Sequence, residues 1–304
     1  MSPEYNPPTS EAIKSRQNEP DALRLLIAQR RLYRNAKRWL GLRWLGMVLI
    51  GIGAPVVSAI WPHLAVAAGA VAGAWIFVGR TILVAAQSRI TTQAAAVQEQ
   101  FDFYVYRMPN TTIRSSLPSR ERIATIAGSD DQLQRVAEKE RLVDWYPVNT
   151  QDDGVVTIAV SQRANAAYTD SLLRTTAIVW SVVTAAWCLT LIIASLLTHV
   201  TLEAFLLGMV LPVLPAFLDV IQYVASVWRS AGDRADLART IEERLGGAES
   251  PDPQELLIWQ EGLFDLRKAA PAVPDLIYKF KRKKSEAAMH SVAEQLSRQA
   301  RGED

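Results

Sequence analysis

The feature that most constrains this chain is the absence of charge over long stretches. No formally charged residue occurs in 44–79 or in 175–202, and 204–228 contains a single acidic residue, Asp219. A helix needs about 20 mostly apolar residues to cross a bilayer core of roughly 30 Å. Each stretch is long enough for one or two crossings, so the sequence predicts a mainly α integral membrane protein.

The two apolar halves share one pattern, that of a helical hairpin. Trp61-Pro62-His63 interrupts the first half and Thr198-His199-Val200-Thr201 interrupts the second. Proline and polar-aromatic residues suit turns at a membrane interface. The predicted spans are about 44–61, 64–86, 176–198 and 202–228, which form one hairpin over 44–86 and a second over 176–228.

Lysine and arginine are distributed unevenly around these spans. Residues 1–43 carry nine Lys or Arg against four Asp or Glu, whereas both hairpin turns carry none. Lys and Arg collect on the cytoplasmic flanks of membrane helices, so we expect both termini in the cytoplasm. The cytoplasmic regions are then a basic N-terminal helix within 1–43, a middle domain over 87–175 and a helical tail over 229–304.

The middle domain has the composition of a small α+β module. The aromatic and β-branched residues of FDFYVY (101–106) and GVVTIAV (154–160) are typical of strands. Short helices are expected around 119–127 and 130–142. We expect this α+β domain to act as a sensor or coupling unit beside the membrane.

The sequence holds no familiar catalytic constellation. Phosphate-binding glycine loops, a nucleophile elbow and zinc-protease motifs are all missing. His63, His199 and His290 fall in separate regions, and the one cysteine, Cys188, lies in an apolar segment. We therefore expect a protein that is not an enzyme, with no metal site and no cofactor. Residues 88–175 carry ten Arg or Lys against eleven Asp or Glu, so long nucleic acid is not an expected partner.

One face of the last predicted span is polar. Spacings of three and four residues place its members on one side of a helix. An ionisable residue inside a span usually faces a bundle interior or a watery cavity, so Asp219 marks either a pore lining or an interhelical bond. The candidate residues are Pro212, Pro215, Asp219, Gln222 and Ser226.

The middle domain also contains arginines and aromatic residues that could bind a small anionic ligand. Arginine binds phosphate in a bidentate manner, and bases stack on aromatic rings. Trp145, Tyr146, Tyr168 and Arg163 are among these residues, although packing in a core is the favoured alternative for most of the aromatics. Arg174 is explained equally well by its place just before a span.

Four segments together resemble the SMODS-associated four-transmembrane effector family, over roughly residues 13–230. They are SRQNEPDALRLLIAQRRLYRNAKRW, EQFDFYVYRMPN, DWYPVN and SQRANAAYTDSLLR, in an order of hairpin, domain and hairpin. The chain has Ser161 and Tyr168 where a cysteine and a tryptophan are usual. Members are pore-forming effectors found beside bacterial cGAS-like nucleotidyltransferases in antiphage operons.

The resemblance implies a cyclic di- or trinucleotide signal that activates the protein, which then permeabilises the bacterial inner membrane and causes growth arrest or abortive infection. Membrane lipid and further copies of the chain are the other expected partners. The alternative is a non-enzymatic membrane scaffold that recruits a cytoplasmic partner. The residues expected to bind ligand or couple it to the membrane, or else to contact neighbouring helices or headgroups, are Trp145, Tyr146, Gln162, Arg163, Asn165, Tyr168 and Arg174.

Overall fold

Long helices dominate the structure, a computed structural model that describes residues 5–110, 114–197, 201–206, 210–247 and 250–301. Within these ranges no residue is assigned to a β-strand. The prediction of a mainly α protein is therefore confirmed, and the α+β middle domain is wrong.

The first half of the chain is a long antiparallel helix pair. Pro20 starts its first helix, where a missing N–H costs nothing. The chain then turns at Trp61 and returns as one continuous rod with a π-helical turn in its middle. The elements are α1 (Ser10–Arg16), α2 (Pro20–Ile60), η1 (Pro62–Leu64), α3 (Ala65–Val78), η2 (Gly79–Leu83) and α4 (Val84–Tyr106).

The second half contains another long pair, preceded and followed by shorter helices. Asp153 starts the longer helix of this pair, because its carboxylate accepts the Val156 N–H at 2.8 Å. The elements are α5 (Arg120–Ala127), η3 (Asp130–Gln132), α6 (Leu133–Glu140), α7 (Gly154–Leu197), α8 (Leu202–Phe205), α9 (Leu211–Leu245), α10 (Pro253–Lys268) and α11 (Asp275–Ala300).

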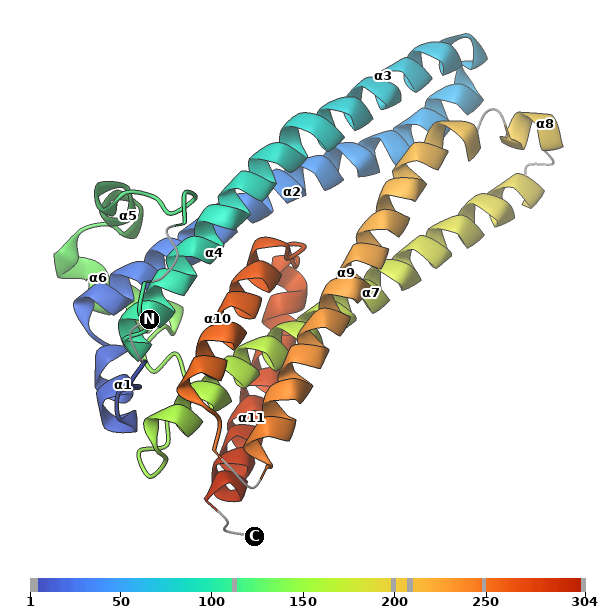
Figure 1. The fold of residues 1–304 in the computed structure, drawn as a ribbon. Coiled ribbons are helices and arrows are strands. Elements are labelled where there is room, and N and C mark those ends of the chain that lie inside the picture. Colours follow the sequence, from blue (N-terminus) through green and yellow to red (C-terminus); the bar gives the residue numbers. More distant parts are fainter. Residues whose placement is uncertain (1–4, 111–113, 198–200, 207–209, 248–249, 302–304) are drawn as a thin grey trace.

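The two long pairs lie beside each other, and α1, α5, α6, α10 and α11 gather at one end, whereas α8 lies near the other (Figure 1). α5 and α6 contact α2, while α10 and α11 contact α7 and α9. Both chain ends lie at this end of the molecule, opposite the turn between α2 and α3. The turn between α10 and α11 points along the long helices towards the opposite end.

Exposed apolar side chains concentrate in the parts of the long helices that the sequence predicts as spans. Val66 is 85% exposed and Leu197 is 74% exposed, and the large exposed hydrophobics fall within 42–82 and 178–228 except for Ile258. A contiguous belt of this kind marks a surface that lipid covers. The largest buried cluster instead joins α1, α2, α4, α5, α6 and α7 with parts of α9, α10 and α11.

Two helices, Val66–Tyr106 and Gly154–Leu197, are long and apolar enough to cross a bilayer. The first predicted span is the second half of α2. The fourth begins within 202–210, of which 207–209 lie outside the described residues. The predicted turn at 198–201 also lies largely outside them.

The predicted strand at 101–106 is the last turn and a half of α4. Phe101 and Val105 stand four residues apart, share one face and are fully buried, and Tyr106 is buried as well. The helix enters from the membrane side and ends at Arg107, whose left-handed backbone (φ 53°) caps it. Burial against the core thus overrides the strand propensity of these residues.

The predicted strand at 154–160 is the first part of α7. Residues 156–162 are buried without interruption, because α1, α9, α10 and α11 all contact this helix. A helix buried on every side shows no polar face, so its apolar run reads like a strand. Consequently 161–174 is not a junction between a strand and a helix but the middle of one helix that continues to Leu197.

Candidate functional site

A cavity of about 750 Å³ lies inside the folded end of the molecule, and we call it the cationic cavity. Its wall is built from α2, α4, α7, α9, α10 and α11, together with the segment that follows α6 and the segment that joins α10 to α11. That volume is within the usual range for small-molecule sites, about 300–1,000 Å³. No single part of the chain could form it alone.

The charges in the wall are strongly unbalanced. The acidic residue in the lining is Asp144, against six cations: Arg30, Arg34, Lys37, Arg141, Arg234 and Arg267. Glu140, outside the lining, pairs with Arg30 at 3.0 Å and with Arg34 at 3.1 Å. The excess of cations makes the cavity suitable for an anion.

A fully buried carboxylate lies behind the wall of this cavity and binds two of the lining residues, Tyr146 and Arg267. Asp102 of α4 accepts hydrogen bonds from the Tyr146 hydroxyl at 2.6 Å, the Gln260 amide at 2.7 Å and the Arg267 guanidinium at 2.6 Å. Gln260 and Arg267 are seven residues apart in α10 and therefore share a face. Burial, with the Asp102 carboxylate second, raises the pKa of Tyr146 far above its ordinary value, so this hydroxyl remains a donor.

Arg267 has donors to spare. Only Nη1 reaches Asp102, and its buried Nε and Nη2 have no hydrogen-bond partner in the part of the chain that the structure describes. Burial opposes its charge, but the Asp102 carboxylate together with Tyr146 and Tyr33 offsets that effect and holds the pKa of Arg267 above its usual value. Buried guanidinium donors without acceptors are costly, and an anion in the cavity would satisfy them.

Arg234 is a second buried cation in the wall. It is 3% exposed and donates to the Ser230 carbonyl at 2.9 Å and to the Leu266 carbonyl in the last turn of α10. Burial lowers the pKa of Arg234 to about 10, so it is still charged near neutral pH. Tyr33 lies nearby, and burial raises the pKa of its hydroxyl to about 12. That hydroxyl donates to Gln98 at 3.3 Å.

The seven residues predicted to bind ligand or couple it separate into two groups. Trp145, Tyr146, Asn165 and Tyr168 line the cationic cavity.

The other three predicted residues have different neighbours. Gln162 lies behind the wall, where its amide donates to the Leu256 carbonyl at 2.9 Å and to Gln260 at 3.1 Å. Arg163 pairs with Glu242, and Arg174 pairs with Asp170 at 2.7 Å.

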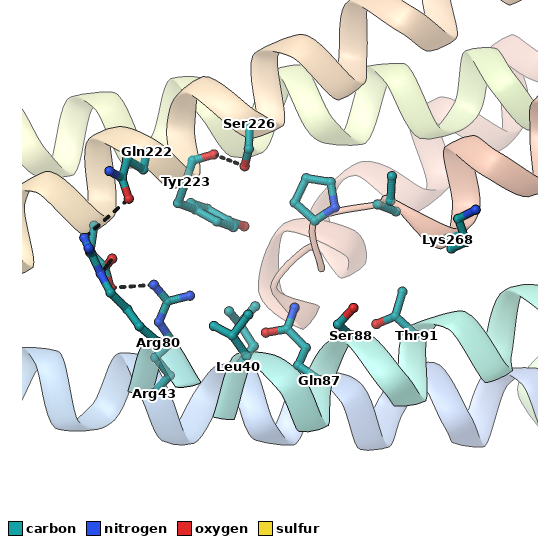
Figure 2. A pocket seen from close by; sticks show the side chains of 15 residues that line it. Leu40, Arg43, Arg80, Gln87, Ser88, Thr91, Gln222, Tyr223, Ser226 and Lys268 are labelled. Atoms are coloured by element: carbon teal, nitrogen blue, oxygen red, sulfur yellow. Dashed lines mark hydrogen bonds and ion pairs between the residues drawn. The ribbon is translucent and has the colours of Figure 1, made fainter. Parts of the chain in front are cut away.

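A second cavity, of about 500 Å³, lies between the two long helix pairs, and we call it the inter-hairpin cavity. Figure 2 shows Leu40, Arg43 and Arg80 facing Gln222, Tyr223 and Ser226 across this space. Of the predicted polar face, Asp219, Gln222 and Ser226 line it. The side chains of Pro212 and Pro215 lie outside the described residues.

Asp219 joins the two hairpins. It is 2% exposed, accepts from Arg80 Nε at 2.8 Å and also pairs with Arg43. Arg80 stands in the π-helical turn η2 and donates in addition to Gln222 at 3.3 Å. The geometry thus has Asp219 in an interhelical bond and in a cavity wall at the same time.

Several residues of the cationic cavity escaped the sequence reasoning. Arg30, Arg34 and Lys37 belong to a basic segment that membrane topology explains by itself, and Arg267 gave no signal beside its heptad spacing from Gln260. Arg267 and Asp102 are 165 positions apart, so nothing local could pair them. Among the described residues, no group of three His, Cys, Asp or Glu side chains could hold a metal.

The apolar belt, the spanning helices and the two polar cavities define a helical membrane protein with a folded, ligand-sized chamber at one end. A model of the SMODS-associating 4TM effector domain matches residues 11–296, so the chain belongs to that family. The resemblance found in the sequence is thereby confirmed. The comparisons with curated proteins and with solved structures gave no match.

Proposed function

We propose that the protein is a non-enzymatic effector of the bacterial inner membrane that senses a cyclic di- or trinucleotide and permeabilises that membrane. A cognate cGAS-like nucleotidyltransferase would make the signal during phage infection, and the leak would cause growth arrest or abortive infection. The observation that carries this proposal is the cationic cavity, with six cations against one carboxylate in its wall.

The chemistry of the wall suits a cyclic oligonucleotide in particular. Such a ligand presents several phosphodiesters and several bases in one compact ring. Arg234 and Arg267 offer buried donors to the phosphates, while Tyr33, Trp145 and Tyr168 offer rings for base stacking. A cavity of about 750 Å³ suits a small ligand rather than a long nucleic acid, which agrees with the charge balance of the sequence.

A continuous helix supports coupling between the ligand and the membrane. α7 contributes Asn165 and Tyr168 to the cationic cavity and then runs without a break to Leu197 in the apolar belt. A shift at its cavity end would be carried into the second hairpin, where Asp219 borders the inter-hairpin cavity. The ligand must bind the active state more tightly than the resting state for this to work.

The proposal includes a cytoplasmic location for both termini and assembly into homo-oligomers in the lipid. The collection of Lys and Arg near the folded end supports that orientation. Gly69 and Gly73 of α3 have nothing within 4 Å of an added Cβ, so this small-residue face is unpacked in one chain. It is accessible to lipid or to a second copy.

Dye-loaded liposomes containing the full-length protein provide the test. We expect leakage after addition of at least one member of a panel of cyclic di- and trinucleotides, and none with linear dinucleotides of the same bases. If a cyclic nucleotide binds without leakage and a cytoplasmic protein co-purifies stably, the scaffold alternative is correct and membrane permeabilisation is not.

A further inference from the structure

One short segment separates the two cavities. Residues 269–274 connect α10 to α11, and within them Ala270 and Pro271 line both the cationic cavity and the inter-hairpin cavity. Thr91 of α4 also borders both. Figure 2 shows the chain that follows Lys268 lying between α9 and α4. We call residues 269–274 the linker.

The linker is built to be extended and uncharged. Its sequence is AAPAVP, and its two prolines prevent the helix from continuing through it. An apolar segment at the mouth of a polar cavity blocks water and ions because it offers no side-chain donors or acceptors. It therefore forms an apolar border between the inter-hairpin cavity and the cationic cavity.

Weak contacts hold the linker in place. The Tyr223 hydroxyl donates to the Ala272 carbonyl at 2.9 Å, and Ala272 and Val273 pack against a cluster that includes Leu40 and Trp44. Tyr223 is itself positioned by Trp44, with ring centroids 5.3 Å apart. These few contacts could be released by a ligand of ordinary affinity.

The linker is attached directly to the cations of the ligand cavity. Arg267 precedes it by one turn at most, and Arg234 holds the Leu266 carbonyl in the same last turn of α10. An anion that engages both guanidiniums would accept from Nε and Nη2 of Arg267 and would compete with the Leu266 carbonyl for Arg234. The end of α10 would then be free to move, and the linker with it.

We propose that the linker is a plug between the two cavities, and that phosphate groups bound by Arg234 and Arg267 withdraw it and join them into one path. This inference rests on the proposed function, because it gives the step by which ligand binding opens the membrane. It also locates the phosphate-binding part of the site at the end of α10 and not in α7, which contains the sequence-predicted Asn165 and Tyr168.

Tyr223→Phe is the first test, measured as dye release from liposomes without ligand and at graded concentrations of the activating cyclic oligonucleotide. It removes the hydroxyl that holds Ala272 and keeps the aromatic ring. One lost hydrogen bond corresponds to about a fivefold change in the balance between the closed and open states. We expect about fivefold more ligand-free leakage, or a half-maximal ligand concentration about fivefold lower. Tyr104→Phe is the matched control, since its hydroxyl bonds Glu19 far from the linker.

A cross-link is the second test. Ser88 and Ala270 both line the inter-hairpin cavity, so cysteines at these positions can be joined by a short reducible reagent in a Cys188→Ala background. We expect the linked protein to bind ligand but not to leak, and to leak again after reduction.

The outcomes separate the plug from the proposed function. If the wild type leaks with ligand and the linked protein leaks equally, the plug is refuted while the function stands. Equal leakage by Tyr223→Phe and Tyr104→Phe also refutes the plug. If the wild type binds every cyclic nucleotide without leaking, the proposed function fails. Ligand-free leakage of Tyr223→Phe above that of Tyr104→Phe would support the plug even then.

Discussion

Arg267→Gln should weaken ligand binding more than any substitution in α7. Arg267 lines the cationic cavity with two buried donors, Nε and Nη2, that have no acceptor. A hydrogen bond to a charged group contributes about 1.5–3 kcal/mol, so loss of one phosphate contact should weaken binding about 10- to 150-fold. Isothermal titration calorimetry on the detergent-solubilised full-length protein measures this change.

Asp102→Asn should have the opposite effect on ligand binding, because it strengthens binding whereas Arg267→Gln weakens it. Asp102 is fully buried and neutralises Arg267 at 2.6 Å. Removal of one partner from a buried ion pair typically costs about 3–5 kcal/mol of folding stability. The melting temperature should therefore fall, while the affinity for an anionic ligand should rise, since Arg267 then lacks an internal counter-ion. Tryptophan fluorescence during heating measures the first effect and calorimetry the second.

Arg163→Gln is the matched control. Arg163 is equally an arginine of the folded end, but it pairs with Glu242 and does not line the cavity. We expect affinity within about twofold of the wild type, because Arg163 does not line the cavity. Arg267 is not the phosphate-binding residue if Arg163→Gln weakens binding as much as Arg267→Gln does, or if folded Arg267→Gln binds ligand like the wild type.

Three further predictions concern the membrane path, the fold and the topology. Asp219→Asn leaves Arg43 and Arg80 without their shared carboxylate, so in liposome assays we expect more ligand-free leakage and a stronger preference for anions; unchanged behaviour would favour a scaffold. Gly154→Ala places a Cβ 1.8 Å from the Pro8 carbonyl oxygen. The overcrowding should reduce the folding stability by about 1–3 kcal/mol and so lower the melting temperature. Gly232→Ala is the control and should not lower it, because no described atom lies within 4 Å of the added Cβ. A single cysteine at Lys139 in a Cys188→Ala background should react with an impermeant maleimide only after the inner membrane is opened; labelling in intact spheroplasts would contradict a cytoplasmic folded end.

The membrane-spanning part of the fold could be predicted from the sequence, because local amino-acid composition is enough to indicate a span. Charge-free stretches and a proline-containing interruption predict hairpins without any knowledge of long-range contacts. The predicted interruption at Trp61-Pro62-His63 corresponds to the end of α2 at Ile60 and the short helix η1.

The folded end was not readable in the same way. Phe101 lies on the buried face of a helix end rich in aromatic residues, and Ile158 lies in a run of α7 that is buried without interruption, so periodicity could not distinguish these segments from strands. In each case contacts with distant helices decided the outcome, and one sequence contains no record of them.

The sequence predicted only part of the candidate site, because residue type does not show which way a side chain faces. Trp145 and Tyr168 stood out as aromatics in a charged region, and they do line the cationic cavity. Arg163 and Arg174 stood out equally but satisfy their charges with Glu242 and Asp170. Residue type predicts what a side chain can bind, whereas the tertiary structure decides whether it faces the cavity.

Current across a planar bilayer tests the central claim most directly, namely that a ligand in the cationic cavity opens a path through the membrane. The full-length protein is inserted, and the activating cyclic oligonucleotide is added to one side at a time. We predict a current only when ligand is added on the side of the bilayer where the folded end lies. It should carry anions in preference, because Arg43, Arg80 and Lys268 outnumber Asp219 in the wall of the inter-hairpin cavity. Saturating ligand that binds, as calorimetry would show, but evokes no current from either side would contradict the account.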